Sequence, residues 1–103
     1  MFGKSKEKRR MKQKVTSLHG QAIRYVTERV DDNDDVIGRG GSITVTDTEL
    51  LLFASGDIIF RAKAEDVKAS DLLSGDGVVL SASDLTRNGE YRTVVAYFVY
   101  HRK

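Results

Sequence analysis

The chain has 103 residues and contains no cysteine. Structural disulfides, thiolate metal sites and cysteine nucleophiles are therefore excluded together, and we expect the protein to reside in a reducing cytoplasm. Long apolar runs are also missing. The longest extends from Val94 to Val99, and none follows the charged N-terminus within the first 20 residues. We therefore expect neither a signal peptide nor a membrane anchor.

Histidine is scarce, which bears on catalysis. The chain has two histidines, His19 and His101. Acid–base catalysis usually needs a histidine or closely placed carboxylates within reach of each other. Two isolated histidines near the ends of predicted elements are usually surface residues, so we expect no catalytic residues and no enzyme. A small enzyme acting near Tyr100, His101 and Arg102 remains an open alternative.

Charge is unevenly distributed along the chain. The net charge is +2, but the first 14 residues contain seven basic residues against Glu7 and carry +6, so the remaining 89 residues carry −4. With 40% apolar and 31% charged residues, the composition is typical of a folded globular protein with one modest core. We expect two parts: a basic segment over residues 1 to 19 and a β domain over residues 20 to 103.

The basic segment is predicted to be helical from about residue 5 to residue 18. It is rich in Lys, Glu, Gln, Arg and Met and contains no proline. Met11, Val15 and Leu18 follow an i, i+4, i+7 spacing and form one narrow apolar stripe that is a candidate for packing on the β domain. The basic residues are candidates for binding an anionic surface: Lys4, Lys6, Lys8, Arg9, Arg10, Lys12 and Lys14.

The rest of the chain predicts short antiparallel strands joined by polar turns. Residues 40 to 60, "GGSITVTDTELLLFASGDIIF", contain three apolar runs separated by two short turns. The acidic run at 31 to 35 is predicted to be a turn, and the glycines at 38, 40 and 41 a bulge or bend. The pair Asn88 and Gly89 is a strong hairpin signal, and Ser83 and Asp84 are interpreted as turn formers.

Two segments allow more than one interpretation. "AEDVKASDLLSGDG" can begin with a helical turn capped by Asp66 or form a short strand through Val67, Ala69 and Leu72. The last segment, "YRTVVAYFVYHR", has a helical spacing of apolar residues, but its Val, Tyr and Phe content favours a strand. The predicted fold is mainly β, a small antiparallel meander that forms a partly open barrel or curved sheet.

Two motifs resemble ligand sites but lack residues that such sites require. The run from Asp31 matches the first three ligand positions of a calcium loop, but Val36 replaces the required glycine and Ser42 the bidentate acid. "GRGG" at 38 to 41 lacks the third glycine of a dinucleotide fingerprint and the lysine of a P-loop. We therefore expect no metal and no cofactor.

The order of these segments resembles the pleckstrin-homology-like superfamily, especially GRAM-type and bacterial PH-like modules. The resemblance covers residues 21 to 101 and rests on "ITVTDTELLLF", "GDIIFRAKAEDVKAS", "GVVLSAS" and the closing aromatic strand. It implies a barrel whose open end is covered by an amphipathic helix. Here the N-terminal helix would take that place through Met11, Val15 and Leu18; the alternative is a second subunit.

The resemblance also implies binding of phosphoinositides or protein segments. The basic pattern that binds lipid between the first two strands of family members is replaced here by "DDNDD". The leading interpretation is therefore a non-catalytic interaction module that binds an unidentified protein or itself, by strand addition or in a groove. The alternative is binding of an anionic membrane surface, or less favourably of nucleic acid, through the basic segment.

Overall fold

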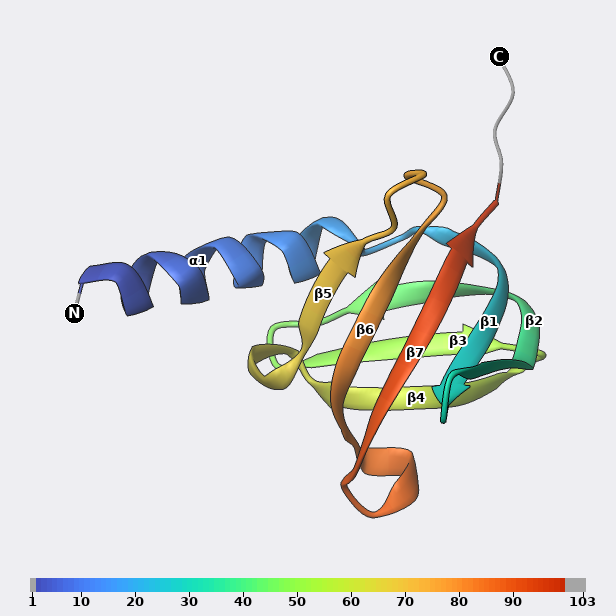
Figure 1. The fold of residues 1–103 in the computed structure, drawn as a ribbon. Coiled ribbons are helices and arrows are strands. Elements are labelled where there is room, and N and C mark those ends of the chain that lie inside the picture. The colour runs from blue at the N-terminus through green and yellow to red at the C-terminus, as the bar shows by residue number, and fades with distance from the viewer. Residues whose placement is uncertain (1, 100–103) are drawn as a thin grey trace.

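The chain folds into one curled antiparallel sheet with a helix packed beside it (Figure 1). The computed structural model describes residues 2 to 99, with side chains from residue 10 onward. Helix α1 spans Phe2–Ser17, and the strands are β1 (Ala22–Val30), β2 (Asn33–Val45), β3 (Glu49–Ala54), β4 (Asp57–Lys63), β5 (Lys68–Asp71), β6 (Gly77–Asp84) and β7 (Glu90–Phe98). The predicted mainly β fold, a small curled meander with an N-terminal helix, is confirmed.

The seven strands lie in the order β4-β3-β2-β1-β7-β6-β5 and form a half-barrel. Each neighbouring pair is antiparallel. The first and last strands of the chain's meander, β1 and β7, are paired in the middle of the sheet, and this pairing joins its two halves. The edges are therefore β4 and β5, which are connected in sequence by the short 3-10 turn η1 (Ala64–Asp66).

A two-residue turn sets the register of the first hairpin. Asp31 and Asp32 both have positive φ, 47° and 68°, which a type I′ turn requires at both central positions. The predicted turn over residues 31 to 35 was therefore too long, because Asn33 pairs with Val30 and already belongs to β2. A run of Asp and Asn marks a turn but does not show which two residues occupy its centre.

The glycines of β2 lie where the sheet bends. The register between β1 and β2 shifts at Ile37, next to Gly38. A Cβ at Gly38 would lie 2.6 Å from the Cβ of Ala54, and one at Gly41 would lie 1.7 Å from the carbonyl oxygen of Phe53. Glycine at these positions lets β2 approach β3 closely while it bends, as the sequence predicted.

Residues 64 to 77 contain both the helical turn and the strand, but Asp66 does not cap the turn as predicted: it is the last residue of the turn, the N-cap is Lys63, and the Asp66 side chain accepts from the Ser83 amide. The turn η1 comes first and the four-residue strand β5 follows, with Val67 and Ala69 buried. The predicted hairpin at Asn88 and Gly89 is present after a second 3-10 turn, η2 (Leu85–Arg87), and leads into β7. The last segment is a strand as predicted. The candidate group Tyr100, His101 and Arg102 lies outside the described residues.

The core fills the concave side of the sheet and extends under the C-terminal part of α1. Its members come from alternate positions of the strands, as expected when one face of each strand is buried. The buried apolar cluster consists of Val15, Leu18, Ile23, Val26, Ile43, Leu50, Leu52, Ala54, Phe60, Ala62, Val67, Ala69, Val78, Leu80, Ala82, Val94 and Ala96.

Candidate interaction surfaces

Helix α1 is attached to the half-barrel by its C-terminal turns. Val15 is 1% exposed and Leu18 3% exposed, and both belong to the core, while Met11 packs against its rim. The backbone N–H of Ala69 in β5 donates to the sulfur of Met11 at 3.3 Å, and Lys14 forms an ion pair with Asp71. The narrow apolar stripe of the sequence thus lies against β5 and η1.

The seven basic candidates all lie within the range of α1. The helix begins at Phe2, three residues earlier than predicted, so it includes Lys4, Lys6, Lys8 and Arg9, whose side chains are outside the described residues. Arg10 and Lys12 are exposed. The N-terminal part of α1 projects away from the sheet in Figure 1, so the backbone that carries these basic positions extends beyond the half-barrel and does not lie over its opening.

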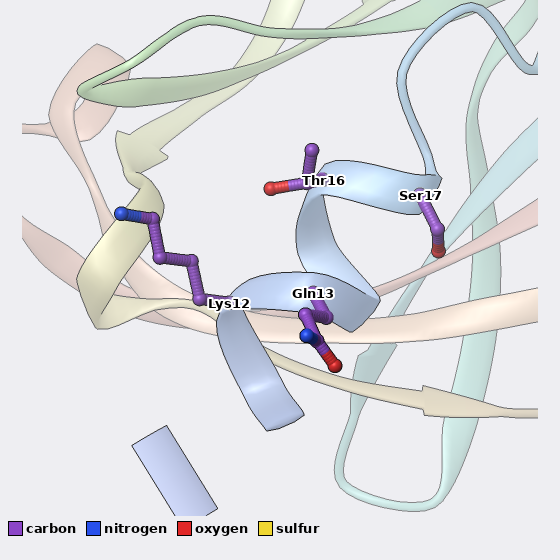
Figure 2. A pocket seen from close by; sticks show the side chains of 4 residues that line it. All are labelled: Lys12, Gln13, Thr16 and Ser17. Carbon is purple, nitrogen blue, oxygen red and sulfur yellow. The ribbon is translucent and has the colours of Figure 1, made fainter. Parts of the chain in front are cut away.

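The outward side of α1 has a hollow of about 470 Å³ lined by Lys12, Gln13, Thr16 and Ser17 (Figure 2). All four residues come from a single helix. A site for a small molecule is normally a cleft that buries most of its ligand between elements. The hollow is therefore an open stretch of helix surface and not an enclosed ligand site.

The histidine next to α1 has a structural partner. The Nδ1 atom of His19 accepts a hydrogen bond of 2.9 Å from the backbone N–H of Val45 at the end of β2. The adjacent backbone is fixed as well, because the N–H of Gly20 donates to the carbonyl of Ile43 at 2.8 Å. His19 therefore helps to fix the connection between helix and sheet, and this nitrogen is not available as a base.

A buried ionic cluster formed by side chains of β1, β6 and β7 lies against the edge strand β4. The guanidinium of Arg92 in β7 binds Glu28 through Nε and Nη2, at 2.7 and 2.9 Å. Its Nη1 donates to Asp84 and, at 3.2 Å, to the carbonyl oxygen of Ile59. Arg92 is 4% exposed and Asp84 is completely buried. Asp84 also accepts hydrogen bonds from the backbone N–H and the hydroxyl of Thr86, at 2.9 and 2.7 Å.

Mutual hydrogen bonding keeps the three groups charged. The hydrogen bond from Arg92 lowers the pKa of Glu28, although partial burial opposes it. Burial acts to raise the pKa of Asp84, but hydrogen bonds from Thr86, the Arg61 amide and Arg92 outweigh it and hold the pKa below its ordinary value. The hydrogen bond to Glu28 raises the pKa of Arg92 in spite of its burial.

This arrangement is suited to structure rather than to acid–base chemistry. A general acid or base needs a pKa near the working pH, whereas both carboxylates are shifted further into the ionised range. A hollow of about 280 Å³ beside the cluster is lined by Ile37, Ile58, Ile59, Thr86, Arg87 and Arg92. Because four of the five N–H donors of Arg92 have protein partners, the buried guanidinium has little capacity left for an anionic ligand.

The sequence interpretation missed this cluster and treated Asp84 as a turn former. The alternation of side chains between the two faces of each strand would have revealed the cluster. Arg92 precedes the buried Val94 and Ala96 by two and four positions, and Glu28 follows the buried Val26 by two. Three charges at core-facing positions of adjacent strands must be paired, because an isolated buried charge is too costly.

Both sheet edges have backbone groups that are already bonded, which bears on the expected strand addition. On β4, the N–H of Arg61 donates to Asp84 at 3.1 Å and the carbonyl of Ile59 accepts from Arg92. On β5, the N–H of Ala69 donates to Met11. An added strand needs these groups free, so the structure offers little support for binding by strand addition.

The acidic hairpin is a solvated surface. Asp31, Asp32, Asp34 and Asp35 are exposed, and Asp34 forms an ion pair with Arg29 at 3.2 Å. Among the residues that the structure describes, no group of three or more His, Cys, Asp or Glu side chains is arranged to hold a metal ion. Within the same part of the chain, no helix is both long and apolar enough to cross a membrane.

Comparison of the chain with family models, with curated proteins and with solved structures finds no match in any of the three. The resemblance to PH-like modules therefore stays a prediction, and the case for a function depends on the surfaces described above.

Proposed function

We propose that the protein is a non-catalytic binding module of the cytoplasm that contacts a polyanionic surface through helix α1. The observation that carries this proposal is that the C-terminal end of the helix is fixed in the core while basic residues occupy its exposed positions. Val15 and Leu18 anchor its C-terminal turns in the core, while its exposed positions include Arg10 and Lys12. The half-barrel thus serves as a scaffold that holds the basic helix α1 in a fixed orientation.

Electrostatics favours a polyanion over a small ligand. The first 14 residues carry +6 and the rest of the chain −4, so the field of the molecule is polarised along its length. Such a charge distribution orients the protein as it approaches a dense array of negative charges. A single small anion would use only one or two of these basic residues.

A second candidate function is protein binding by a PH-like domain, and one observation favours it. The convex face of the sheet carries Tyr25 and Tyr97, stacked with their ring centroids 4.5 Å apart, and Arg24 lies over the ring of Tyr25. Both tyrosines are partly exposed, and the pair is the kind of aromatic surface that protein interfaces use.

Heparin tests the main proposal, because it is a polyanion without apolar groups. Replacing Lys8, Arg10 and Lys12 with Gln removes three charges from α1. Each basic residue near a highly charged anionic surface contributes about 1 kcal/mol, so affinity should fall by about a hundredfold. The logarithm of the affinity should also depend less steeply on the logarithm of the salt concentration.

The matched control replaces Arg24, Lys63 and Arg87 with Gln, which removes the same charge from exposed positions of the half-barrel. This variant should retain nearly all of its heparin affinity. Equal losses in the two triple variants would show that net charge alone causes binding, and the proposal for α1 would then be wrong.

A further inference from the structure

We infer that the polyanionic surface is an anionic lipid bilayer, and that the β5–β6 loop inserts Leu73 into it beside α1. This inference rests on the proposed function and adds a second contact to it. Leu73 is fully exposed, whereas every other large apolar side chain with a described exposure is at least partly covered. An exposed apolar tip next to a basic helix is the combination that an anionic bilayer can bind at both its headgroups and its acyl chains.

The loop holds Leu73 outward in a defined conformation. Across its base, the N–H of Leu72 donates to the carbonyl of Gly77 at 3.0 Å, and the N–H of Gly75 donates to the carbonyl of Leu72 at 2.9 Å. A third bond of 2.8 Å joins the Phe98 amide in β7 to the carbonyl of Asp76. Leu73 is therefore exposed at the tip of a closed loop.

The loop and the helix are physically connected. Asp71, two residues before Leu73, forms an ion pair with Lys14 of α1. Figure 1 shows β5 ending beside the C-terminal end of α1, with the loop rising from that point. A second partly exposed apolar residue, Val99, lies at the same end of the sheet, where its N–H donates to the carbonyl of Ala22 at 3.0 Å.

Two other occupants fit this surface less well. A nucleic acid would contact the basic helix but gain nothing from a fully exposed leucine. A second copy of the chain would need about 800 Å² of contact on each partner for a stable dimer, and one leucine with one half-covered valine supplies much less. Basic charge combined with a small inserting group matches the two-signal binding of peripheral membrane proteins.

Tryptophan fluorescence tests insertion directly, because the chain contains no tryptophan. The full chain with Leu73→Trp is mixed with vesicles of equal parts phosphatidylcholine and phosphatidylserine. The emission should shift to the blue and become protected from an aqueous quencher. The matched control is Leu85→Trp, which should show neither change: Leu85 is 42% exposed and belongs to η2, the orange turn at the opposite end of the sheet from the β5–β6 loop in Figure 1.

The binding of substituted chains to vesicles measures how much each contact contributes to affinity. Leu73→Ser should weaken binding to these vesicles by roughly tenfold, the effect of withdrawing one leucine side chain from an apolar phase, and should leave heparin affinity unchanged. Asp76→Asn removes a negative charge from the inserting loop and should strengthen vesicle binding by up to about fivefold. Vesicles of phosphatidylcholine alone should bind the wild-type chain at least tenfold more weakly.

The outcomes separate this inference from the proposed function. Binding to heparin without binding to the mixed vesicles would overturn the inference and leave the function of α1 intact. Vesicle binding that ignores Leu73→Ser, or a tryptophan at 73 that stays accessible to the quencher, would also overturn it. A fall in the sedimentation mass on Leu73→Ser without lipid would overturn it in favour of self-association. Loss of heparin binding would refute the underlying function.

Discussion

The two edges of the sheet are covered in opposite ways. At the β5 edge, a separate helix brings apolar side chains, with Val15 and Leu18 in the core and Met11 against the Ala69 amide. At the β4 edge, charged side chains from β6 and β7, which are not neighbours of β4 in the sheet order, bond to the backbone directly: Asp84 accepts from the Arg61 amide and Arg92 donates to the Ile59 carbonyl. One edge is covered by an added element, the other by an internal ionic cluster.

This difference predicts that the two edges contribute differently to stability. Apolar packing tolerates partial loss, because neighbouring groups can relax into the space. A buried ionic cluster does not, because each member neutralises the others. The apolar edge is covered by a helix whose outer positions stay exposed, while at the ionic edge two backbone groups of β4 are already bonded and are not free to pair with another strand.

The largest expected effect comes from breaking the ionic edge. Arg92→Met should lower the free energy of unfolding by about 3–5 kcal/mol, because it leaves the buried carboxylate of Asp84 without its cation. Urea denaturation at neutral pH measures this. The control is Arg61→Met, which removes the more exposed ion pair with Glu49 and should cost less than about 1 kcal/mol. Equal losses in both variants would contradict the distinction.

Breaking the apolar edge should have a smaller effect. Leu18→Ala should lower the free energy of unfolding by about 2–3 kcal/mol, toward the lower end of the range for a buried leucine, because α1 can settle into part of the space. Thr16→Ala, at an exposed position of the same helix, should change stability by less than about 0.5 kcal/mol. A Leu18→Ala loss as small as that of Thr16→Ala would show that α1 is not part of the fold.

The smallest expected effect is a pH dependence of the free energy of unfolding, caused by the two carboxylates of the ionic edge. The folded-state pKa values of Glu28 and Asp84 lie below their ordinary values of 4.5 and 3.8, so in acid the unfolded chain binds more protons than the folded chain. Their contribution is present above those ordinary values and is lost as the pH falls through the folded-state values. Glu28→Gln should therefore destabilise the protein at neutral pH, and the difference from wild type should shrink in acid. A difference that is constant with pH would contradict this.

Much of the fold could be predicted from local sequence, and the two edges show where prediction failed. The hairpins follow from period-2 patterns and from turn residues such as Asn88 and Gly89, which act within a few positions. The apolar stripe of α1 was visible because it follows one helical spacing. The ionic edge depends on three residues separated by up to 64 positions, and no local pattern states that Glu28 meets Arg92.

Of the candidate surfaces, one could also be predicted from local sequence and the other could not. Clustered charge is a property of composition, so the basic residues could be named from the sequence. The exposure of Leu73 could not be predicted, since two adjacent leucines at 72 and 73 do not show which side chain the closed loop leaves outside. Its connection to α1 depends on the ion pair between Lys14 and Asp71, which are 57 positions apart.

The most direct test of the central claim is a heteronuclear NMR titration of the full chain with heparin, with the shift of each amide measured. We predict that the changes concentrate in α1 and the turn that follows it, from Arg10 to Leu18, and fade across β5, while the Arg61 amide at the ionic edge stays unchanged. Changes centred on β4 or on the convex face around Tyr25 and Tyr97, with α1 unaffected, would contradict the account and move the binding surface to the sheet.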